Sequence, residues 1–507
     1  MPKIVLATIN ARFIHASAGL RYLYANLGDM QPYAQIAEFE NAQPAKEIVE
    51  AIVQADPVIV GFGVYIWNAN RTREVVSLLR MVRPDILIVI GGPEVSYEYQ
   101  DTPLFRMCDY LVTGEADLAF PALCRELLAG NRPATNVIEG GLPNLPEVQL
   151  PYEWYTDSDI AHRVLYIEAS RGCPFTCEFC LSSVDLPVRQ FDHQRVLDEL
   201  KRLFDRGART FKFVDRTFNL NVRTSSTILQ FFLDRMEEGL FVHFEMVPDR
   251  FPAQLREMVA KFPPGSLQLE IGVQTLNPEV SALISRRQDV PKLFDNLQFL
   301  RRETHAYLHV DLIVGLPGED IQSFGRGFDS LVATNPHEIQ VGILKRLRGT
   351  PIVRHTEEYK LQFSDEPPYE VLATRDVSFL DMQRMERFAR YWDLVANSGN
   401  FTQSKHLIWR DTESPFHAFL EFSDWLFGRV GRRASIQLKA LTECLFQFLV
   451  EVRGHEGATV GPILAEDYQR GGRSDLPKSL RSFATASSGK ARESVLALKR
   501  QQRALES

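Results

Sequence analysis

The sequence predicts an α/β protein with three folded regions: a parallel, doubly wound sheet, an incomplete β/α barrel and a mainly helical region. Three observations predict this order. Short apolar runs alternate with amphipathic segments over residues 1–130, the alternation returns over residues 163–352, and the pattern becomes helical over residues 353–468. A length of 507 residues agrees with several domains, because single cores rarely grow beyond about 300 residues.

The first region is expected to form parallel βαβ units, because its short strands are separated by helices of ordinary length. A sheet of this kind binds ligands in the loops at the carboxyl ends of its strands. The expected strands are residues 4–9, 34–39, 58–65, 86–90 and 110–113. The expected helices are residues 19–27, 45–55, 72–81 and 119–128.

The second region repeats the alternation with six expected strands, which indicates a partial barrel with its site at the carboxyl ends of the strands. The expected strands are residues 164–169, 211–214, 242–246, 267–272, 308–314 and 338–344. The expected helices are residues 194–205, 225–237, 252–261, 290–302 and 321–333.

The remaining segments differ in composition. Residues 131–162 are rich in Pro and Gly, which break both helix and strand, so they are expected to be a linker. The third region contains the expected helices 380–398 and 436–452. Residues 469–507 carry nine Lys or Arg against three Asp or Glu. We expect a basic tail of poor order there, with a docking arm as the alternative.

The composition excludes several classes of protein. Hydrophobic residues make up 45% and charged residues 24%, which excludes disordered and fibrous chains. A net charge of −8 argues against nucleic acid as a partner, because phosphate contacts need clustered Lys and Arg. The longest apolar runs are strand-sized, well short of the roughly 20 residues of a spanning helix. We therefore expect a cytoplasmic protein without a membrane partner.

Three of the six cysteines lie within eight residues. Cys173, Cys177 and Cys180 have the spacing C-x3-C-x2-C directly after an expected strand, so they occupy a loop at the carboxyl end of the barrel. Structural zinc takes four ligands, whereas a [4Fe–4S] cluster held by three thiolates keeps one iron open. The other cysteines, Cys108, Cys124 and Cys444, are expected to be buried and structural.

This segment resembles the signature of the radical S-adenosylmethionine (SAM) superfamily, including the aromatic Phe179 just before the last cysteine. The resemblance implies that the open iron binds SAM. It further implies that the reduced cluster cleaves SAM to a 5′-deoxyadenosyl radical, which abstracts hydrogen from a substrate inside the barrel. An electron donor such as flavodoxin or ferredoxin is expected on the same basis.

The resemblance also assigns residues to SAM at the strand ends. Residues 311–319 resemble the family pattern G-x-I-x-G-x-P-x-E, although Asp311 stands at the first Gly. An ordinary strand end with polar capping residues is the alternative for each position. The assigned positions are Gly315, Pro317 and Glu319 near the adenine, Gln274 and Glu270 near the ribose, and Asp215 and Glu245 near the methionine moiety.

A parallel sheet before such a barrel resembles the cobalamin-binding subfamily, which implies a Rossmann-like cobalamin domain. Glycines at strand ends let the backbone approach a large flat ligand, because Gly lacks a Cβ. The residues that carry this resemblance are Gly91, Gly92, Gly114, Glu115 and Tyr65. The helical region resembles an uncharacterised extension found in the same subfamily. A nucleotide-binding domain is disfavoured, because no G-x-G-x-x-G follows the first strand.

His15 departs from the family pattern D-x-H-x-x-G, in which the His ligates cobalt. It lies four residues before Gly19 rather than three, and the Asp is missing. We interpret His15 as a polar loop residue in preference to a cobalt ligand. Cobalamin is then expected to bind without a lower ligand from the protein. Loss of cobalamin is the alternative.

The expected function is methylation of an unactivated carbon of an unknown small molecule, with a [4Fe–4S] cluster, SAM and cobalamin as cofactors. One alternative is a radical SAM cyclase or rearranging enzyme without methyl transfer. Another is a non-catalytic cobalamin sensor or scaffold. A methylthio-transferring tRNA enzyme is weaker, because Cys108 and Cys124 alone cannot supply three thiolates for a second cluster.

Overall fold

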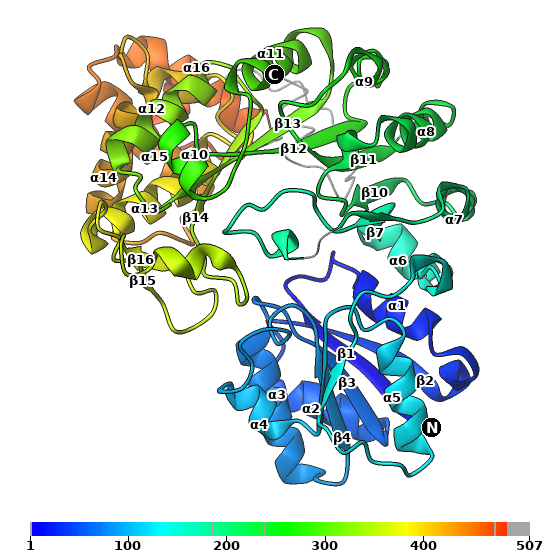
Figure 1. Cartoon of the computed structure of the whole chain (residues 1–507). Coiled ribbons are helices and arrows are strands. Elements are labelled where there is room, and N and C mark those ends of the chain that lie inside the picture. Colours follow the sequence, from blue (N-terminus) through cyan, green and yellow to red (C-terminus); the bar gives the residue numbers. More distant parts are fainter. Residues whose placement is uncertain (1–2, 185–186, 238, 471–472, 484–507) are drawn as a thin grey trace.

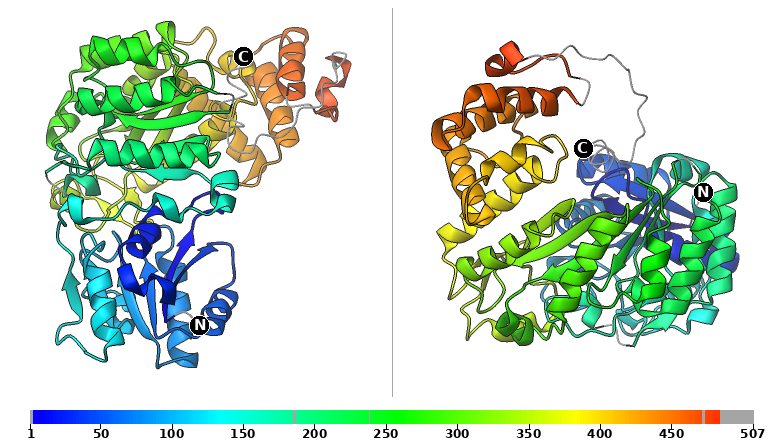
Figure 2. Two further views of the ribbon diagram at one scale, coloured as in Figure 1. Left: turned by 90° about the vertical axis from the view of Figure 1, so that its right-hand side faces the viewer. Right: turned by 90° about the horizontal axis from the view of Figure 1, so that it is seen from above.

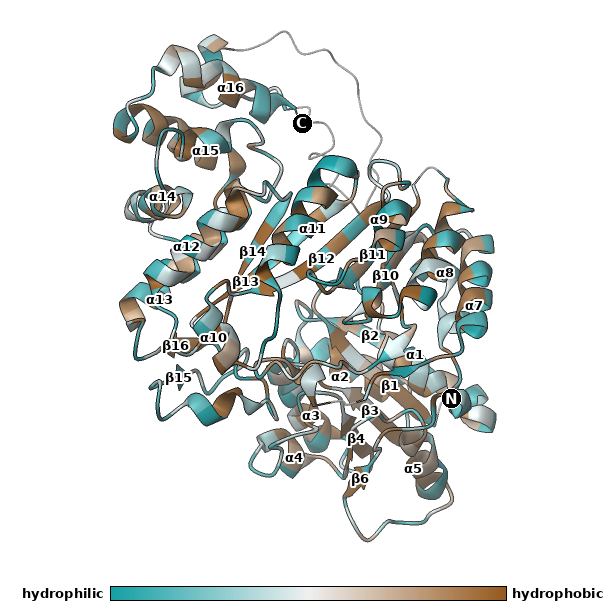
Figure 3. Ribbon diagram, turned by 45° about the horizontal axis from the view of Figure 1, so that its top comes forward, coloured by the Kyte–Doolittle hydropathy of each residue, from teal (hydrophilic) through white to brown (hydrophobic). Residues whose placement is uncertain are grey.

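The computed structural model describes residues 3–184, 187–237, 239–470 and 473–483. Figure 1 shows the N-terminal domain below the barrel, with the helical region beside strand β14. Hydrophobic residues concentrate in the strands, whereas helices such as α7 carry hydrophilic residues (Figure 3). Among the described residues, no helix is both long and apolar enough to cross a membrane.

The N-terminal domain contains a parallel sheet of six strands in the order β2-β1-β3-β4-β5-β6. Core residues place helices α2, α3 and α4 on one face and α1 and α5 on the other, which confirms the doubly wound sheet. The strands are β1 (Ile4–Asn10), β2 (Ala34–Glu40), β3 (Ile59–Gly63), β4 (Leu87–Gly91), β5 (Tyr110–Thr113) and β6 (Val137–Glu139). The helices are α1 (Ala18–Ala25), α2 (Ala45–Gln54), α3 (Ala69–Val82), α4 (Pro103–Met107) and α5 (Ala119–Leu128).

The expectation that residues 131–162 lack helix and strand is wrong. Strand β6 pairs with β5 at the edge of the first sheet, and helix α6 (Asp157–His162) follows. An edge strand of three residues needs only one partner, so nearby Pro and Gly do not prevent it. The capping box of Thr156 and Asp159 at the start of α6 is a local signal that the interpretation as a linker overlooked.

The second sheet confirms all six expected strands, which run parallel in the order β14-β13-β12-β11-β10-β7. This sequential order is that of an open β/α barrel. The strands are β7 (Leu165–Ile167), β10 (Thr210–Phe213), β11 (Phe241–Met246), β12 (Leu267–Gln274), β13 (Tyr307–Val314) and β14 (Glu338–Ile343). The helices are α7 (His193–Asp205), α8 (Val222–Leu233), α9 (Ala253–Val259), α10 (Pro278–Leu283), α11 (Val290–Glu303) and α12 (Ile321–Val332).

The C-terminal region is mainly helical, as expected, and flanks the barrel (Figure 2). It shares one core with the barrel: the rings of Phe328, Phe388 and Phe416, from α12, α13 and α14, are fully buried and in mutual contact. The helices are α13 (Phe379–Val395), α14 (Pro415–Val430), α15 (Leu438–Gln447) and α16 (Gly457–Gln469). A hairpin of β15 (Gln362–Phe363) and β16 (Val371–Ala373) precedes them, and β8 (Ser170–Arg171) pairs with β9 (Arg189–Gln190) in the barrel.

Part of the expected basic tail is folded. A 3₁₀ helix, Lys478–Phe483, lies against α16, where Phe483 packs over Gly461 and Leu480 is fully buried. The expectation of poor order is wrong for residues 473–483, because average composition concealed a few well-spaced apolar side chains. The expectation for residues 484–507 lies outside the described residues.

A glycine on α12 permits the contact between barrel and helical region. A Cβ at Gly325 would lie 2.5 Å from Cδ1 of the buried Phe416 ring. We expect Gly325→Ala to destabilise the protein by about 1–3 kcal/mol through overpacking, measured by thermal or denaturant unfolding.

Gly428 provides the matched control, because it lies inside α14 and a Cβ there has no neighbour within 4 Å. Gly428→Ala should be neutral or stabilising by up to about 1 kcal/mol, since Ala is the better helix former. Equal effects of the two substitutions would contradict this account of the contact.

Candidate cofactor sites at the barrel mouth and between the domains

The three cysteines of the signature lie on one loop, residues 172–180, which begins where β8 ends. All three side chains line a cavity of about 230 Å³, here called the cysteine cavity. Cys173 and Cys177 are each 8% exposed. Burial raises the pKa of both thiols, so their sulfurs stay protonated until a bound cation compensates the charge.

This set of donors suits a cluster better than a single ion. Among the residues that the structure describes, no three His, Cys, Asp or Glu side chains surround one metal position. In a [4Fe–4S] cluster each thiolate ligates a different iron, so the three sulfurs need not converge on one point. Arg286 donates from Nη1 to the sulfur of Cys177 across 3.6 Å, a contact that would tune the reduction potential of a cluster held there.

A buried carboxylate inside the loop fixes its position. Glu178 is 3% exposed, and its carboxylate accepts a hydrogen bond from Ser285 at 2.6 Å and contacts His355 Nε2 at 2.8 Å. Its backbone N–H donates to Ile284, and its carbonyl accepts from Ile352. Glu178 is not predicted from the sequence, because partners more than a hundred residues away leave no local signal.

Three of the residues expected to contact SAM line the opposite wall of the cysteine cavity: Gln274, Glu270 and Glu245. Glu270 lies 2.9 Å from His243 Nε2 and 3.4 Å from Lys212 Nζ. Burial alone would raise the pKa of Glu270, but these two neighbours outweigh it and lower the pKa. The wall therefore presents a fixed negative charge beside the amide of Gln274.

Arg216 links this cavity to a second one. Its Nη1 donates to both carboxylate oxygens of Glu245 at 3.1 Å. Burial raises the pKa of Glu245 in spite of this partner. Arg216 lines both the cysteine cavity and the larger cavity between the domains. The sequence analysis did not single out Arg216, although it directly follows Asp215 at an expected strand end.

Asp215 supports the cysteine loop from behind. It is buried, and its carboxylate accepts hydrogen bonds from the Ala169 N–H at 2.9 Å and the Ser170 hydroxyl at 2.6 Å. Burial raises its pKa to about 7. Asp215 lines neither cavity and holds the backbone just before Cys173, which differs from the expected contact with the methionine moiety.

The other expected SAM residues do not line the cysteine cavity. Gly315 has a φ of +87°, and a Cβ there would lie 2.5 Å from Val371 of β16, so this glycine admits the C-terminal region. Pro317 is buried beside it. Glu319 accepts a hydrogen bond from Thr275 at 2.7 Å, and its other oxygen is buried without a partner.

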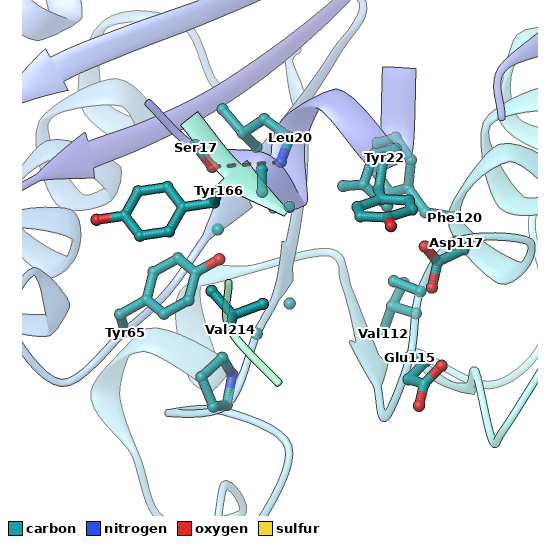
Figure 4. Close-up of a pocket in the computed structure, with 18 of the residues that line it drawn as sticks. Ser17, Leu20, Tyr22, Tyr65, Val112, Glu115, Asp117, Phe120, Tyr166 and Val214 are labelled. Atoms are coloured by element: carbon teal, nitrogen blue, oxygen red, sulfur yellow. Dashed lines mark hydrogen bonds between the residues drawn. The ribbon is translucent and has the colours of Figure 1, made fainter. Parts of the chain in front are cut away.

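A cavity of about 760 Å³, here called the interdomain cavity, separates the carboxyl ends of the first sheet from those of β7 and β10. Its size is in the range of ordinary ligand sites. Figure 4 shows Tyr65 beside Tyr166 of the barrel, with Glu115 and Asp117 across the space. Its lining includes the five residues that carry the cobalamin resemblance, Tyr65, Gly91, Gly92, Gly114 and Glu115, together with the candidate His15.

Gly92 shows why this wall needs glycine. It has a φ of +109°, and a Cβ would lie 2.5 Å from the carbonyl oxygen of Val64. The two strand-end loops therefore pack directly on each other, with no room for a side chain at Gly92. Backbone at such a turn can approach a broad planar group such as a corrin ring.

His15 crosses to the barrel. Its Nδ1 lies 2.6 Å from the hydroxyl of Tyr166, and its backbone forms a parallel bridge with Val164. Burial lowers the pKa of His15, and the charges of Lys212 and Arg12 lower it further, so the imidazole is neutral. The geometry gives His15 a contact between the domains.

The two cavities are held together by Arg171, two residues before Cys173. Its Nη1 donates to Glu115 at 2.8 Å and to Asp117 at 2.7 Å, and its Nε donates to Glu168 at 3.0 Å. Only 11% of its side chain is exposed. The sequence offered one signal for this role, a cation beside the Gly of the cysteine signature.

The effect of the close contact at Gly92 on stability can be measured separately from the effect of its positive φ. Gly92→Ala should lower the thermal stability of the cofactor-free protein more than Gly130→Ala, by about 1–3 kcal/mol of overpacking. Both glycines have positive φ, but a Cβ at Gly130 meets nothing within 4 Å. Equal losses would show that strain alone explains the glycine.

Glu319 generates a prediction about pH. Burial raises its pKa from 4.5 to about 7, so the folded state holds this proton more tightly and stability falls as pH rises through that window. Glu319→Gln keeps an oxygen for Thr275, so at pH 8 it should be more stable than wild type by about 3–4 kcal/mol, at about 1.4 kcal/mol per pKa unit.

At pH 4 the gain from Glu319→Gln should vanish, and unfolding at both pH values checks this. Glu257→Gln, at an exposed position, is the control and should show no such pH dependence. A gain that is the same at both pH values would contradict the assignment of the proton to Glu319.

Three family descriptions match successive parts of the chain. Residues 4–124 match the B12 binding domain, residues 167–330 match the Radical SAM superfamily, and residues 357–506 match a protein of unknown function (DUF4080). The first matched range contains the N-terminal domain's glycines that line the interdomain cavity. The second contains the cysteine loop and most of the barrel sheet.

Curated relatives include 2-(S-pantetheinyl)-carbapenam-3-carboxylate methyltransferase of Streptantibioticus cattleyicolor, 25% identical over 66% of this chain and 54% of that protein. The cobalamin-dependent radical SAM methyltransferase TokK of Streptomyces tokunonensis is also 25% identical, with the same coverage. This chain thus spans about half the length of both relatives.

Solved structures share the fold. The cobalamin-dependent radical enzyme OxsB, with aqua-cobalamin and SAM bound, has a TM-score of 0.59 and 14% identity over 100% of this chain and 83% of its own. TsrM from Kitasatospora setae, with cobalamin and a [4Fe–4S] cluster bound, has a TM-score of 0.58 and 17% identity over 72% and 78%. The chain is a radical SAM protein with an N-terminal B12-binding domain and a C-terminal DUF4080 region.

Proposed function

We propose that this protein uses SAM and cobalamin together to methylate an unactivated carbon of a small molecule. The observation that carries the proposal is the wall shared by the two cavities, because Arg216 lines both. A substrate held beside this guanidinium reaches both cavities without crossing solvent. Two relatives named as methyltransferases support the same reaction class.

The chain supplies binding, orientation and shielding. Cys173, Cys177 and Cys180 hold the cluster, and Gln274 with Glu270 presents polar groups to SAM. When bound, the cluster with SAM supplies hydrogen abstraction, and cobalamin supplies the methyl group. The barrel wall and the N-terminal domain flank the space between the cavities, and shielding from water there would protect reactive species.

Two further elements belong to the proposal. A one-electron donor such as flavodoxin or ferredoxin would reduce the cluster, since the described side chains include no redox group besides thiols and aromatic rings. A cytoplasmic location suits six cysteines that form no disulfide, because reducing compartments keep thiols free.

Anaerobic reconstitution with iron, sulfide and cobalamin, followed by reduction in the presence of SAM, tests the proposal. The wild-type protein should release 5′-deoxyadenosine, and it should form S-adenosylhomocysteine only when cobalamin is present. Cys177→Ala should reduce 5′-deoxyadenosine to the level without protein while keeping the corrinoid absorption bands. Cys444→Ala, a buried cysteine in the helical region, should retain both products.

Three outcomes would contradict methyl transfer. Protein that cleaves SAM but never binds cobalamin would remove cobalamin from the mechanism. Bound cobalamin with 5′-deoxyadenosine but without S-adenosylhomocysteine would favour a cyclase or rearranging enzyme. Wild-type protein that binds cobalamin but releases neither product, and so does not differ from Cys177→Ala, would favour a non-catalytic cobalamin sensor.

A further inference from the structure

A third cavity, of about 270 Å³, lies between the barrel and the helical region. Its lining includes Pro336 and His337, just before β14, together with Trp392, Lys405 and Trp409 of the helical region. The strands are parallel, so this position is at the amino end of β14, opposite the end that carries the cysteine loop. The cavity is therefore separate from both cofactor cavities.

One cation, Lys405, lines this cavity, and a second, Arg301, contacts two of the lining residues, Asn335 and His337. Lys405 Nζ donates to the carbonyl of Ala396 at 3.0 Å, and Arg301 donates to the carbonyl of Asn335 at 2.6 Å. Neither cation forms an ion pair with a carboxylate among the described residues. Like charges held together at a partly buried site are unfavourable unless an anion compensates them.

The histidine between these cations carries no compensating or additional charge. His337 Nδ1 accepts a hydrogen bond from the Leu308 N–H at 2.9 Å, and Nε2 lies 3.4 Å from Arg301 Nη1. Burial lowers its pKa to about 3, with Arg301 and Lys405 contributing, so the ring is neutral. Burial likewise lowers the pKa of Lys405 to about 8, which leaves the ammonium charged at neutral pH. Asp467 and Glu338 act on Lys405 through space and oppose the effect of burial on its pKa, but Lys405 forms no ion pair with either carboxylate.

The carboxylate of the helical region that acts electrostatically on Lys405 already has other partners. Asp467 forms an ion pair with Arg470 at 2.9 Å and accepts hydrogen bonds from the backbone and hydroxyl of Ser404. These contacts hold Asp467 against α16 and the segment before Lys405. Asp467 therefore does not place a carboxylate inside the cavity.

Two tryptophans also line the cavity, and one of them has a donor without a partner. Trp392 is 4% exposed, and its indole N–H is buried without a hydrogen-bond partner. Trp409 stacks on Trp392 with ring centroids 5.5 Å apart at 28°. An unpaired buried donor costs free energy, which a bound acceptor would recover. Aromatic walls of this kind favour a flat apolar ligand.

We propose that this cavity binds a small organic anion, an anionic group on a single flat ring, with the charge at Lys405 and the ring against Trp409. A cavity near 270 Å³ holds one ring and its substituent, below the size of most cofactor sites. The inference does not depend on the proposed methyl transfer, because its residues lie at the other end of the barrel.

Binding to the full-length protein is measured by tryptophan fluorescence and thermal shift, with benzoate and phenyl phosphate as probes. We expect saturable binding of at least one probe. Benzyl alcohol, with the ring but no charge, should not bind, and inorganic phosphate, with charge but no ring, should bind more weakly. The comparison of benzoate with phenyl phosphate distinguishes a carboxylate ligand from a phosphate ligand.

Lys405→Gln should weaken probe binding at least tenfold, because the probe loses a hydrogen bond to a charged donor. Lys439→Gln, at a lysine paired with Asp475 on the surface, should leave binding unchanged. Without probe, Lys405→Gln should unfold at the wild-type temperature or above it, because it removes a buried charge that has no ion-pair partner in the described part of the chain and keeps a donor for the Ala396 carbonyl. Arg301→Gln provides a second variant, with the same expected loss of binding.

Failure of both ring anions to bind the wild-type protein would overturn the proposal. Equal binding by the wild type and Lys405→Gln would also overturn it. Each result leaves the proposed methyl transfer untouched, because that reaction is measured on SAM products.

Discussion

The arrangement of both cofactor cavities depends on one buried guanidinium. Arg171 joins Glu115 and Asp117 of the B12-binding domain to Glu168 of the barrel, two residues before Cys173. Removing one partner of a buried ion pair costs about 3–5 kcal/mol, because the remaining charge stays desolvated. The network therefore fixes the distance between the cysteine loop and the first domain, which any transfer between two cofactors requires.

The rest of the site follows from this constraint. Once the two sets of strand ends face each other, the glycine turn at Gly92 forms one wall, and Tyr166 and Val214 of the barrel form the other. Arg216 then lies where the interdomain cavity meets the cysteine cavity. The helical region reinforces the barrel mouth, because His355 contacts Glu178 inside the cysteine loop and Val371 packs on Gly315.

The sequence predicted what local patterns encode. Periodicity located all six barrel strands, and spacing located the three cysteines, since both depend on neighbouring residues. Strand β6 and helices α4 and α10 were not predicted, because each is short and takes its stability from tertiary packing. Glu178 and Arg286 were not predicted as site residues for a related reason: their partners are far away in the chain. Gly315 matched a family pattern but meets the helical region, whose packing no local motif describes.

The central claim is that the cluster and cobalamin occupy adjacent cavities joined at Arg216. X-ray diffraction from the reconstituted protein, recorded at the iron and cobalt absorption edges, tests it most directly. The account predicts iron density at Cys173, Cys177 and Cys180 and cobalt density in the cavity between Gly92 and Tyr166. Cobalt found elsewhere, or a cavity that stays without cobalt when cobalamin is in excess, would contradict it.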